Sequence, residues 1–204
     1  MAAPMNRLAA MVILLASWGA ASAAAQAQEM PPPAYQIAAR RADIPSAVLY
    51  AVALQESGWQ RGGRVVPWPW TLNVAGDARR FHNRGDACAG LQRALREVPS
   101  TRVDAGLGQI NLGYQKHRYD RPCDLLDPYR NLAIAAEILR EQYDPGEDWL
   151  MAMGRYHRPA GGAPAARYRR SVGKHLARVL GPSQAQAALA GWHHGARWQE
   201  RTPR

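Results

Sequence analysis

Cysteine, acidic side chains and long apolar runs are all scarce in this chain. The two cysteines and six histidines show no spacing typical of metal ligands, which argues against a zinc site. Beyond the first 27 residues, no stretch approaches the roughly 20 consecutive apolar residues that a membrane-spanning helix needs. Aspartate and glutamate together number 16 against 26 lysines and arginines, so the formal charge is +10. What remains is a basic chain of 204 residues, enough for one domain with tails.

The first 27 residues predict a secretory signal peptide. Arg7 precedes an apolar run from Leu8 to Trp18, and small residues follow through Ala27. The Ala-x-Ala triplets in that flank are typical cleavage sites, and the apolar run is too short to span a membrane. We therefore expect residues 1–27 to be removed on export to the periplasm. An uncleaved membrane anchor is the alternative.

The basic balance persists without this leader, which carries one arginine and no acid, so that +10 becomes +9. Such a charge suits a polyanionic partner, and export makes the anionic cell wall the expected one. A basic surface without a specific partner is one alternative. An exported nucleic-acid binder is another, but it rests on charge alone, because no single element interleaves basic and aromatic residues. We expect no nucleic-acid partner.

Cys88 and Cys123 form an even pair in a chain expected to reach an oxidising compartment. Such pairs commonly form disulfides. This bridge would stabilise the fold by about 3 to 4 kcal/mol in the chain-entropy model. Two buried free thiols are the alternative, because the sequence does not give the Cα separation that decides between them.

Hydrophobic periodicity predicts a mainly α chain of the α+β, lysozyme-like kind. Helices are expected over 34–42, 46–56, 86–98, 129–143, 149–156 and 165–179. A hairpin is expected from 70–74 and 78–82, with a possible third strand at 102–104. Residues 61–69 are rich in glycine and proline and are predicted to be irregular. Residues 28–182 are thus expected to form one helical domain with a small inserted hairpin or three-stranded sheet, and 183–204 a flexible tail.

Glu56 lies near the end of an apolar helix and is the candidate catalytic residue. Helical spacing places it on the same face as Leu49, Val52 and Ala53, and Ser57-Gly58 ends the helix. A carboxyl group on an apolar face loses solvation, which raises its pKa and suits it to act as a general acid near neutral pH. An exposed or salt-bridged glutamate at a helix end is the alternative for this segment alone.

A second motif runs from Ala105 to Asn111 and contains two glycines two residues apart. Such glycines predict a tight turn whose backbone something can approach closely. Gln109 and Asn111 follow at a spacing of two, so both side chains can face one side.

Four motifs follow one another along the chain: Glu56-Ser57-Gly58, Gly106 to Asn111, Asn131 at a helix start, and Tyr156-His157. In this order they resemble the motifs of the soluble lytic transglycosylases, which cut bacterial peptidoglycan and are related to goose-type lysozyme. The resemblance covers roughly residues 35–180. Trp68 to Asn73 and Val103 to Leu107 look like the branch of the family that accompanies conjugation and type IV secretion machinery.

The resemblance implies a reaction that needs one acid. The family's single glutamate protonates the glycosidic oxygen between N-acetylmuramic acid and N-acetylglucosamine, then takes the proton from the C6 hydroxyl of the muramic acid. That hydroxyl closes on C1 as a 1,6-anhydro sugar, so no second carboxylate is needed, unlike in most glycosidases. By position, Glu56 is this acid. Ser57 and Gln109 match the family's substrate-binding serine and glutamine, and Tyr156 matches a tyrosine whose hydroxyl points toward the acid.

Two residues depart from the family pattern. His157 stands where asparagine is common, and it either binds sugar or only caps a helix end. Asp104 stands where many members have a small apolar residue. We favour a role for Asp104 in capping the glycine turn. As a second carboxylate it would instead make the protein a muramidase.

The sequence therefore predicts a periplasmic, monomeric peptidoglycan lytic transglycosylase that uses no metal and no cofactor. It is expected to open the wall locally for a conjugation or secretion apparatus. Glu56 is the predicted catalytic residue, and the predicted substrate-binding residues are Ser57, Gln109, Asn111, Tyr156 and His157. A non-catalytic wall-binding or assembly protein is the remaining alternative, although such a protein has no need of Glu56.

Overall fold

The computed structural model describes residues 29–181. Its helices are α1 (Pro33–Arg41), α2 (Ser46–Ser57), α3 (Arg84–Glu97), α4 (Pro128–Glu141), α5 (Trp149–His157) and α6 (Gly162–Leu180). Three short 3-10 turns, η1 (Ser100–Arg102), η2 (Lys116–Arg118) and η3 (Pro122–Leu126), connect them. The expected signal peptide and C-terminal tail lie outside the described residues. Within 29–181, none of the helices has the length and apolar character needed to cross a membrane.

All six predicted helices are present, with ends shifted by a few residues. The start of α3 shows why such ends move. The Asn83 side chain accepts a hydrogen bond from the backbone N–H of Asp86 at 2.9 Å, so the helix begins at Arg84, before the predicted Asp86. N-caps of this kind satisfy donors that the helix itself leaves unpaired.

The strands form two antiparallel sheets. The larger has the order β4-β3-β5-β6, from β3 (Thr71–Val74), β4 (Asp77–Arg80), β5 (Val103–Ala105) and β6 (Ile110–Asn111). The predicted hairpin and third strand are confirmed, and β6 adds a fourth strand. A separate hairpin joins β1 (Gly58–Arg61) to β2 (Arg64–Pro67).

The β1–β2 hairpin contradicts the irregular structure predicted for 61–69. The prediction was wrong because Gly62 and Gly63 are adjacent, both with positive φ (54° and 76°), and together they make a two-residue hairpin turn. Val65 on β2 packs against the core, which anchors the hairpin. Glycine here shapes a strand pair rather than breaking one.

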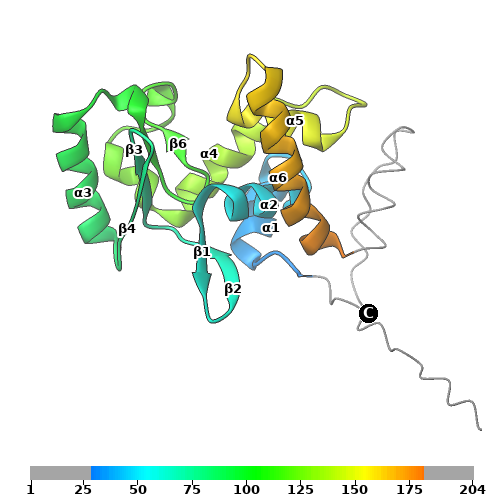
Figure 1. The fold of residues 1–204 in the computed structure, drawn as a ribbon, viewed down its shortest axis with the longest axis horizontal. Coiled ribbons are helices and arrows are strands. Elements are labelled where there is room, and N and C mark those ends of the chain that lie inside the picture. Colours follow the sequence, from blue (N-terminus) through cyan, green and yellow to red (C-terminus); the bar gives the residue numbers. More distant parts are fainter. Residues whose placement is uncertain (1–28, 182–204) are drawn as a thin grey trace, which may run out of the picture.

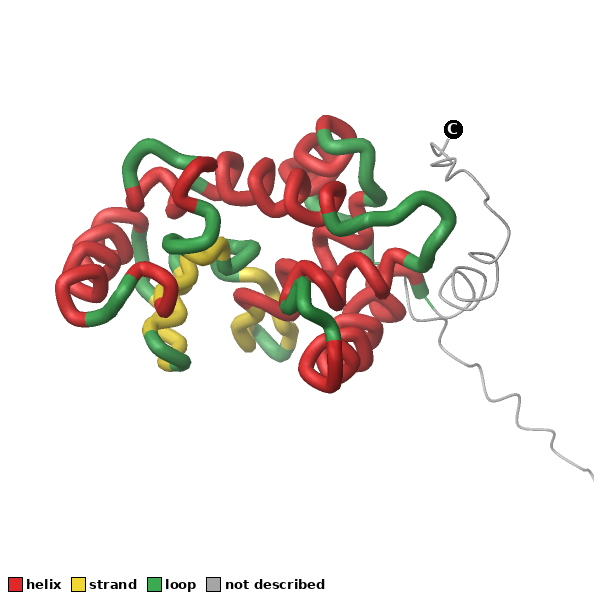
Figure 2. The backbone as a smooth tube through the Cα atoms, turned by 90° about the horizontal axis from the view of Figure 1, so that it is seen from above, coloured by secondary structure: helices red, strands yellow, loops and turns green. Residues whose placement is uncertain are grey.

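Helix α2 is the centre of the helical part. Val48 through Leu54 are all buried, because α1, α4, α5, α6 and β2 contact this helix from different sides. A helix that is apolar all round is expected in such a position. Figure 1 shows α2 with α1 and α6 on one side of the molecule, α3 beside β3 and β4 on the other, and the β1–β2 hairpin between them. From above, the strands lie between helical segments (Figure 2).

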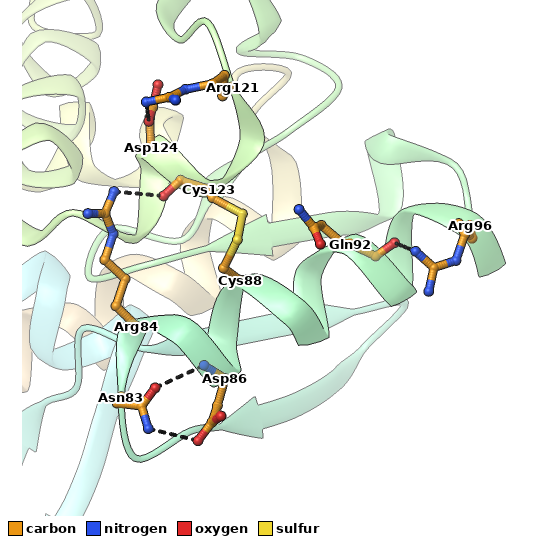
Figure 3. Close-up of a disulfide and its surroundings, with 9 residues drawn as sticks. All are labelled: Asn83, Arg84, Asp86, Cys88, Gln92, Arg96, Arg121, Cys123 and Asp124. Carbon is orange, nitrogen blue, oxygen red and sulfur yellow. Dashed lines mark hydrogen bonds and ion pairs between the residues drawn. A yellow bond between two sulfur atoms is a disulfide. The ribbon is translucent and has the colours of Figure 1, made fainter.

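A disulfide joins Cys88 on α3 to Cys123 on η3, with 5.3 Å between the two Cα atoms (Figure 3). The Arg84 side chain adds a hydrogen bond to the backbone carbonyl of Cys123 at 3.2 Å. The bridge spans 35 residues, and that loop contains β5, β6 and the glycine turn between them. Closing this loop lowers the entropy of the unfolded chain.

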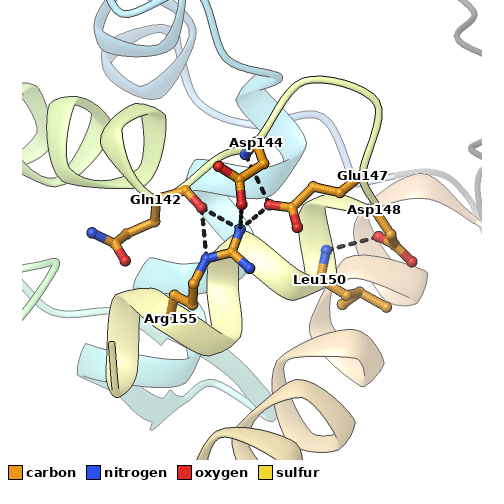
Figure 4. Close-up of polar contacts among 6 residues, drawn as sticks. All are labelled: Gln142, Asp144, Glu147, Asp148, Leu150 and Arg155. Atoms are coloured by element: carbon orange, nitrogen blue, oxygen red, sulfur yellow. Dashed lines mark hydrogen bonds and ion pairs between the residues drawn. The ribbon is translucent and has the colours of Figure 1, made fainter. Parts of the chain in front are cut away.

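The loop between α4 and α5 is held by one arginine. The Arg155 Nε donates to the Gln142 carbonyl at 2.9 Å, and its guanidinium pairs with Asp144 at 3.4 Å and with Glu147 (Figure 4). Arg155 directly precedes Tyr156, so these contacts also set where the end of α5 lies.

Candidate active site

Glu56 lies in the last turn of α2, and Tyr168 on α6 reaches it. The Tyr168 hydroxyl donates a hydrogen bond to Glu56 Oε1 at 2.6 Å. Burial raises the Glu56 pKa to about 7, and the nearby charge of Asp104 raises it further, while the Tyr168 hydrogen bond opposes the shift. Near neutral pH this carboxyl group therefore exists both with and without its proton.

Tyr168 carries no sequence motif that would place it in the site. With Val172, Leu176 and Val179 it forms the buried stripe of α6, and its ring is 7% exposed. The missed signal is its hydroxyl, because a buried tyrosine needs a hydrogen-bond partner and an apolar stripe offers none. The partner here lies 112 residues away in sequence.

Ser57 has no exposed surface. Its hydroxyl lies 3.0 Å from the Ala53 carbonyl oxygen and 2.8 Å from that of Leu107, within hydrogen-bonding distance of both. The predicted contact of Ser57 with the sugar stays a prediction, and in this conformation its side chain is fully buried. Through its contact with the Leu107 carbonyl, Ser57 holds the glycine turn against the end of α2, beside Glu56.

The glycine turn is shaped by two side chains that approach it. A Cβ atom on Gly106 would lie 2.2 Å from Asn131 Nδ2, and one on Gly108 would lie 2.8 Å from the Tyr156 hydroxyl. Asn131, fully buried on α4, donates to the Ala105 and Leu125 carbonyls and accepts from the Gly108 N–H at 2.7 Å. The close approach that the glycines predict is thus made by Asn131 and Tyr156.

Gln109 has φ of +47°, a left-handed conformation that is uncommon for a residue other than glycine. Its Nε2 donates to the Gly106 carbonyl at 2.8 Å and to the Thr71 carbonyl at 3.1 Å. No group within residues 29–181 donates a hydrogen bond to its Oε1. The side chain is therefore held in place with one acceptor still available.

Asp104 lies in a row of three polar residues across the sheet, paired with Asn73 on β3 and with Asn111 on β6. Its Oδ2 accepts from Asn73 Nδ2 at 3.0 Å, and its Oδ1 accepts from Asn111 Nδ2 at 2.8 Å. Burial raises the Asp104 pKa, against the effect of both asparagines and of the nearby His157. The predicted cap is wrong, because the turn's Gly108 N–H bonds Asn131 instead.

The amide of Asn111 is fully occupied. Its Nδ2 also donates to the Thr101 carbonyl at 3.0 Å, and its Oδ1 accepts from the backbone N–H groups of Gly113 and Tyr114, each at 3.0 Å. Both donor hydrogens and both acceptor lone pairs of an asparagine amide are thereby used. These contacts make Asn111 an anchor for Asp104 and the β6 turn, while its predicted role in binding substrate stays a prediction.

Tyr156 and His157 are the last two residues of α5. The Tyr156 hydroxyl donates to the Gly108 carbonyl at 2.6 Å, so the tyrosine hydroxyl bonded to the acid is that of Tyr168, not the predicted one. The His157 ring stacks on the Tyr168 ring, with centroids 4.5 Å apart and planes 7° apart. Burial and the neighbouring Arg158 lower the His157 pKa, which favours a neutral ring.

A family model described as the transglycosylase SLT domain matches residues 33–179, which is 147 of the 204 residues. The chain belongs to the SLT domain family. No curated protein and no solved structure matched the chain. Members of the SLT family are lytic transglycosylases that act on peptidoglycan in the periplasmic wall, so this SLT domain is an enzyme of that class.

The geometry of this SLT domain places Asp104, Tyr156 and Tyr168 near Glu56. Asp104 acts electrostatically on both Glu56 and Tyr156, so α2, β5 and the end of α5 meet at one place. Cys88 and Cys123 lie outside it and hold the chain that carries Asp104. In the described part of this domain, residues 29–181, no cluster of three or more His, Cys, Asp or Glu side chains could hold a metal ion.

Proposed function

We propose that this enzyme cleaves the β-1,4 bond between N-acetylmuramic acid and N-acetylglucosamine and leaves 1,6-anhydro-N-acetylmuramic acid at the new end. One observation carries the proposal. Glu56 is a half-buried carboxyl group with a pKa of about 7 and a tyrosine hydroxyl on one oxygen. Such a group can give up a proton and take one back within a single catalytic cycle.

The protonated Glu56 donates its proton to the glycosidic oxygen, and the bond between that oxygen and C1 breaks. Glu56, now a carboxylate, accepts the proton of the C6 hydroxyl on the same muramic acid residue. The C6 oxygen then bonds C1, so one carbon–oxygen bond replaces another, no water is consumed and Glu56 regains its proton. Tyr168 supports this cycle because its hydrogen bond to Glu56 stabilises the carboxylate.

Two further side chains are proposed to contact the sugar. Gln109 is held by two backbone carbonyls with its Oε1 still available, so it can accept from a sugar hydroxyl or amide. His157 is exposed, with its ring stacked on Tyr168, and it can do the same with a neutral ring nitrogen. Tyr156 positions the glycine turn through Gly108.

A muramidase is the second candidate, and the position of Asp104 favours it. Its charge acts on Glu56, so a water molecule between the two carboxyl groups would lead to hydrolysis. Against this, each Asp104 oxygen already accepts a hydrogen bond from an asparagine on the neighbouring strand. That arrangement suits a fixed anion in the sheet better than a base that must lift a proton from water.

The released products separate the two reactions. Digested sacculi examined by mass spectrometry are expected to give muropeptides one water lighter than the hydrolytic products. Asp104→Asn is expected to retain more than about a tenth of the activity. If Asp104 is not the general base, its replacement does not remove the roughly 10²- to 10⁴-fold rate enhancement that a general base supplies. Reducing-end muramic acid as the main product, with a folded but inactive Asp104→Asn, would establish the muramidase instead.

We further propose that the enzyme is exported by the 1–27 leader as one domain, 28–182, with a C-terminal tail, and serves a conjugation or type IV secretion apparatus. The support is the leader pattern and the resemblance of Trp68 to Asn73 and of Val103 to Leu107 to that branch of the family. N-terminal sequencing of the periplasmic protein tests the cleavage. Restoration of DNA or protein transfer by the wild type but not by Glu56→Gln, in cells lacking the gene, tests the role.

A further inference from the structure

The β1–β2 hairpin begins at the residue after Ser57 and carries a cluster of aromatic and basic side chains. Trp59 and Arg61 lie on the same face of β1, because side chains alternate along a strand. Trp68 packs edge-to-face on Trp59 with ring centroids 5.0 Å apart, and on Trp70 with centroids 5.4 Å apart. We call Trp59, Arg61 and Trp68 the Trp–Arg cluster.

The Arg61 side chain is exposed, and its guanidinium lies over the rings of both Trp59 and Trp68. Its guanidinium carbon lies 4.8 Å from the Trp68 centroid and 5.2 Å from the Trp59 centroid. Within residues 29–181 it has no carboxylate partner and donates no hydrogen bond. Its neighbours differ, since Arg64 on β2 lies 3.6 Å from Glu29 and Arg80 donates to the Gly58 carbonyl at 2.8 Å.

This arrangement orders the guanidinium without using its donors. A cation–π contact holds the guanidinium through its charge and leaves its fork of N–H donors unused; because the Trp59 and Trp68 planes are 74° apart, the guanidinium can lie parallel to at most one of them. That fork of donors matches a carboxylate, which can accept two parallel hydrogen bonds. Arg61 lies over one side of each of the two indole rings, where it would compete with a sugar ring. The cluster therefore presents a fixed cation rather than a stacking platform for a sugar.

Peptidoglycan carries free carboxylates on its stem peptides, whereas the backbone of its glycan is largely uncharged. We propose that the Trp–Arg cluster binds a carboxylate of the stem peptide attached to the glycan bound at Glu56. Arg61 supplies the ion pair, and Trp59 and Trp68 hold its guanidinium in place. The site thereby makes the enzyme prefer glycan that bears peptides. This inference rests on the proposed function, because it needs glycan at Glu56.

The distances are compatible with one substrate reaching both places. Arg61 lies four positions after Ser57 in the sequence, which is about 13 Å along the extended β1. An extended peptide of four residues also covers about 13 Å. Figure 1 shows the hairpin in the space between the helical part and the four-stranded sheet, beside the end of α2 that carries Glu56.

The first experiment measures preference between two substrates. Peptide-bearing glycan strands are compared with the same strands after an amidase has removed their stems, and kcat/KM is measured on each. The preference for the peptide-bearing form is expected to fall about tenfold in Arg61→Gln, the effect of losing one charge-assisted contact. Arg61→Lys should fall between, because it keeps the charge and loses the fork. An unchanged preference in Arg61→Gln overturns the proposal.

Arg96→Gln is the matched control. Arg96 is an exposed arginine near the end of α3, bonded only to the Gln92 carbonyl of its own helix, and the substitution removes the same charge. It should keep the wild-type preference. An equal fall in Arg96→Gln would show that net charge, and not the Trp–Arg cluster, sets the preference, and would also overturn the proposal. Unfolding temperatures of all variants show whether a loss reflects a damaged hairpin.

A binding measurement separates this inference from the proposed function. Peptide-bearing strands, and strands whose stem carboxylates have been converted to amides, are titrated into Glu56→Gln and Glu56→Gln/Arg61→Gln. Amidation should weaken binding about tenfold in the first protein and leave the second unaffected. Equal sensitivity in both overturns the role of Arg61. A fully active Glu56→Gln would instead refute the acid assigned here, while the comparison of binding would still decide about Arg61.

Discussion

Two carboxyl groups act on one another in this enzyme, and their surroundings differ. Glu56 ends a helix packed among helices and has a single hydrogen bond, from Tyr168. Asp104 lies on a sheet and accepts from one asparagine at each oxygen. Burial raises the pKa of both, but only Asp104 has a donor for each oxygen of its charged form. Two acids in one site can thus take different roles, according to which protonation state their neighbours stabilise.

Replacing each acid by its amide tests most directly whether Glu56 and Asp104 have different roles. Glu56→Gln should fold and lose about 10²- to 10⁴-fold in wall-cleaving activity, because an amide cannot deliver the proton. Asp104→Asn keeps a side chain of the same shape among its asparagines and should lose far less. Turbidity loss of purified sacculi, with product analysis, measures both. Similar losses in the two variants would remove the distinction drawn here.

Although Glu56→Gln should lower the activity, it should raise the stability of the fold at high pH. Its pKa is about 7 in the fold against 4.5 for an ordinary glutamate, so folding favours the protonated form. The resulting stability is fully present below pH 4.5 and is lost as pH rises toward 7. Glu56→Gln should therefore be more stable than the wild type at pH 8, by up to about 3 kcal/mol, with the difference vanishing near pH 4. Thermal unfolding at the two pH values checks this, and a less stable Glu56→Gln at pH 8 would contradict the desolvated carboxyl group.

Tyr168→Phe removes the hydroxyl that donates a hydrogen bond to Glu56. The hydrogen bond stabilises the carboxylate, so its loss should raise the Glu56 pKa further. Activity that needs the protonated acid should then persist to higher pH, while the rate at neutral pH falls about tenfold for want of a positioned carboxyl group. Tyr156→Phe is the control, since its hydroxyl bonds Gly108 and not the acid. A pH profile that shifts in Tyr156→Phe and not in Tyr168→Phe would reverse this assignment.

The smallest expected effect lies in the pH profile of Asp104→Asn. The charge of Asp104 helps to raise the Glu56 pKa, so its removal should lower that pKa. In the wild type, activity should decline as pH rises through about 7, where free Glu56 loses its proton. In Asp104→Asn the same decline should begin at lower pH. A profile of kcat/KM against pH measures the shift, and an unmoved profile would mean that the two groups do not interact.

Much of the fold could be predicted because its signals are local. Apolar spacing along 46–56 and 129–143 indicated helices, and alternation around 70–82 indicated the hairpin. The same spacing placed Glu56 on the apolar side of its helix, and the order of short motifs indicated the family that the SLT domain match confirms. These features depend on residues a few positions apart, which share one helix turn or one strand pair.

Only the tertiary structure decided what each side chain touches. Tyr168 meets Glu56 across 112 residues, and Ser57 meets Leu107 across 50. The Asn111 side chain holds Asp104, and the glycine-rich segment after Glu56 forms a hairpin whose Val65 packs against the core. A side chain's type limits which partners it can accept, but the packing of distant helices and strands selects among them. Local sequence patterns therefore predicted most of the elements and the candidate acid, but not β6 or the β1–β2 hairpin, and packing determined which donors surround that acid and hence its pKa.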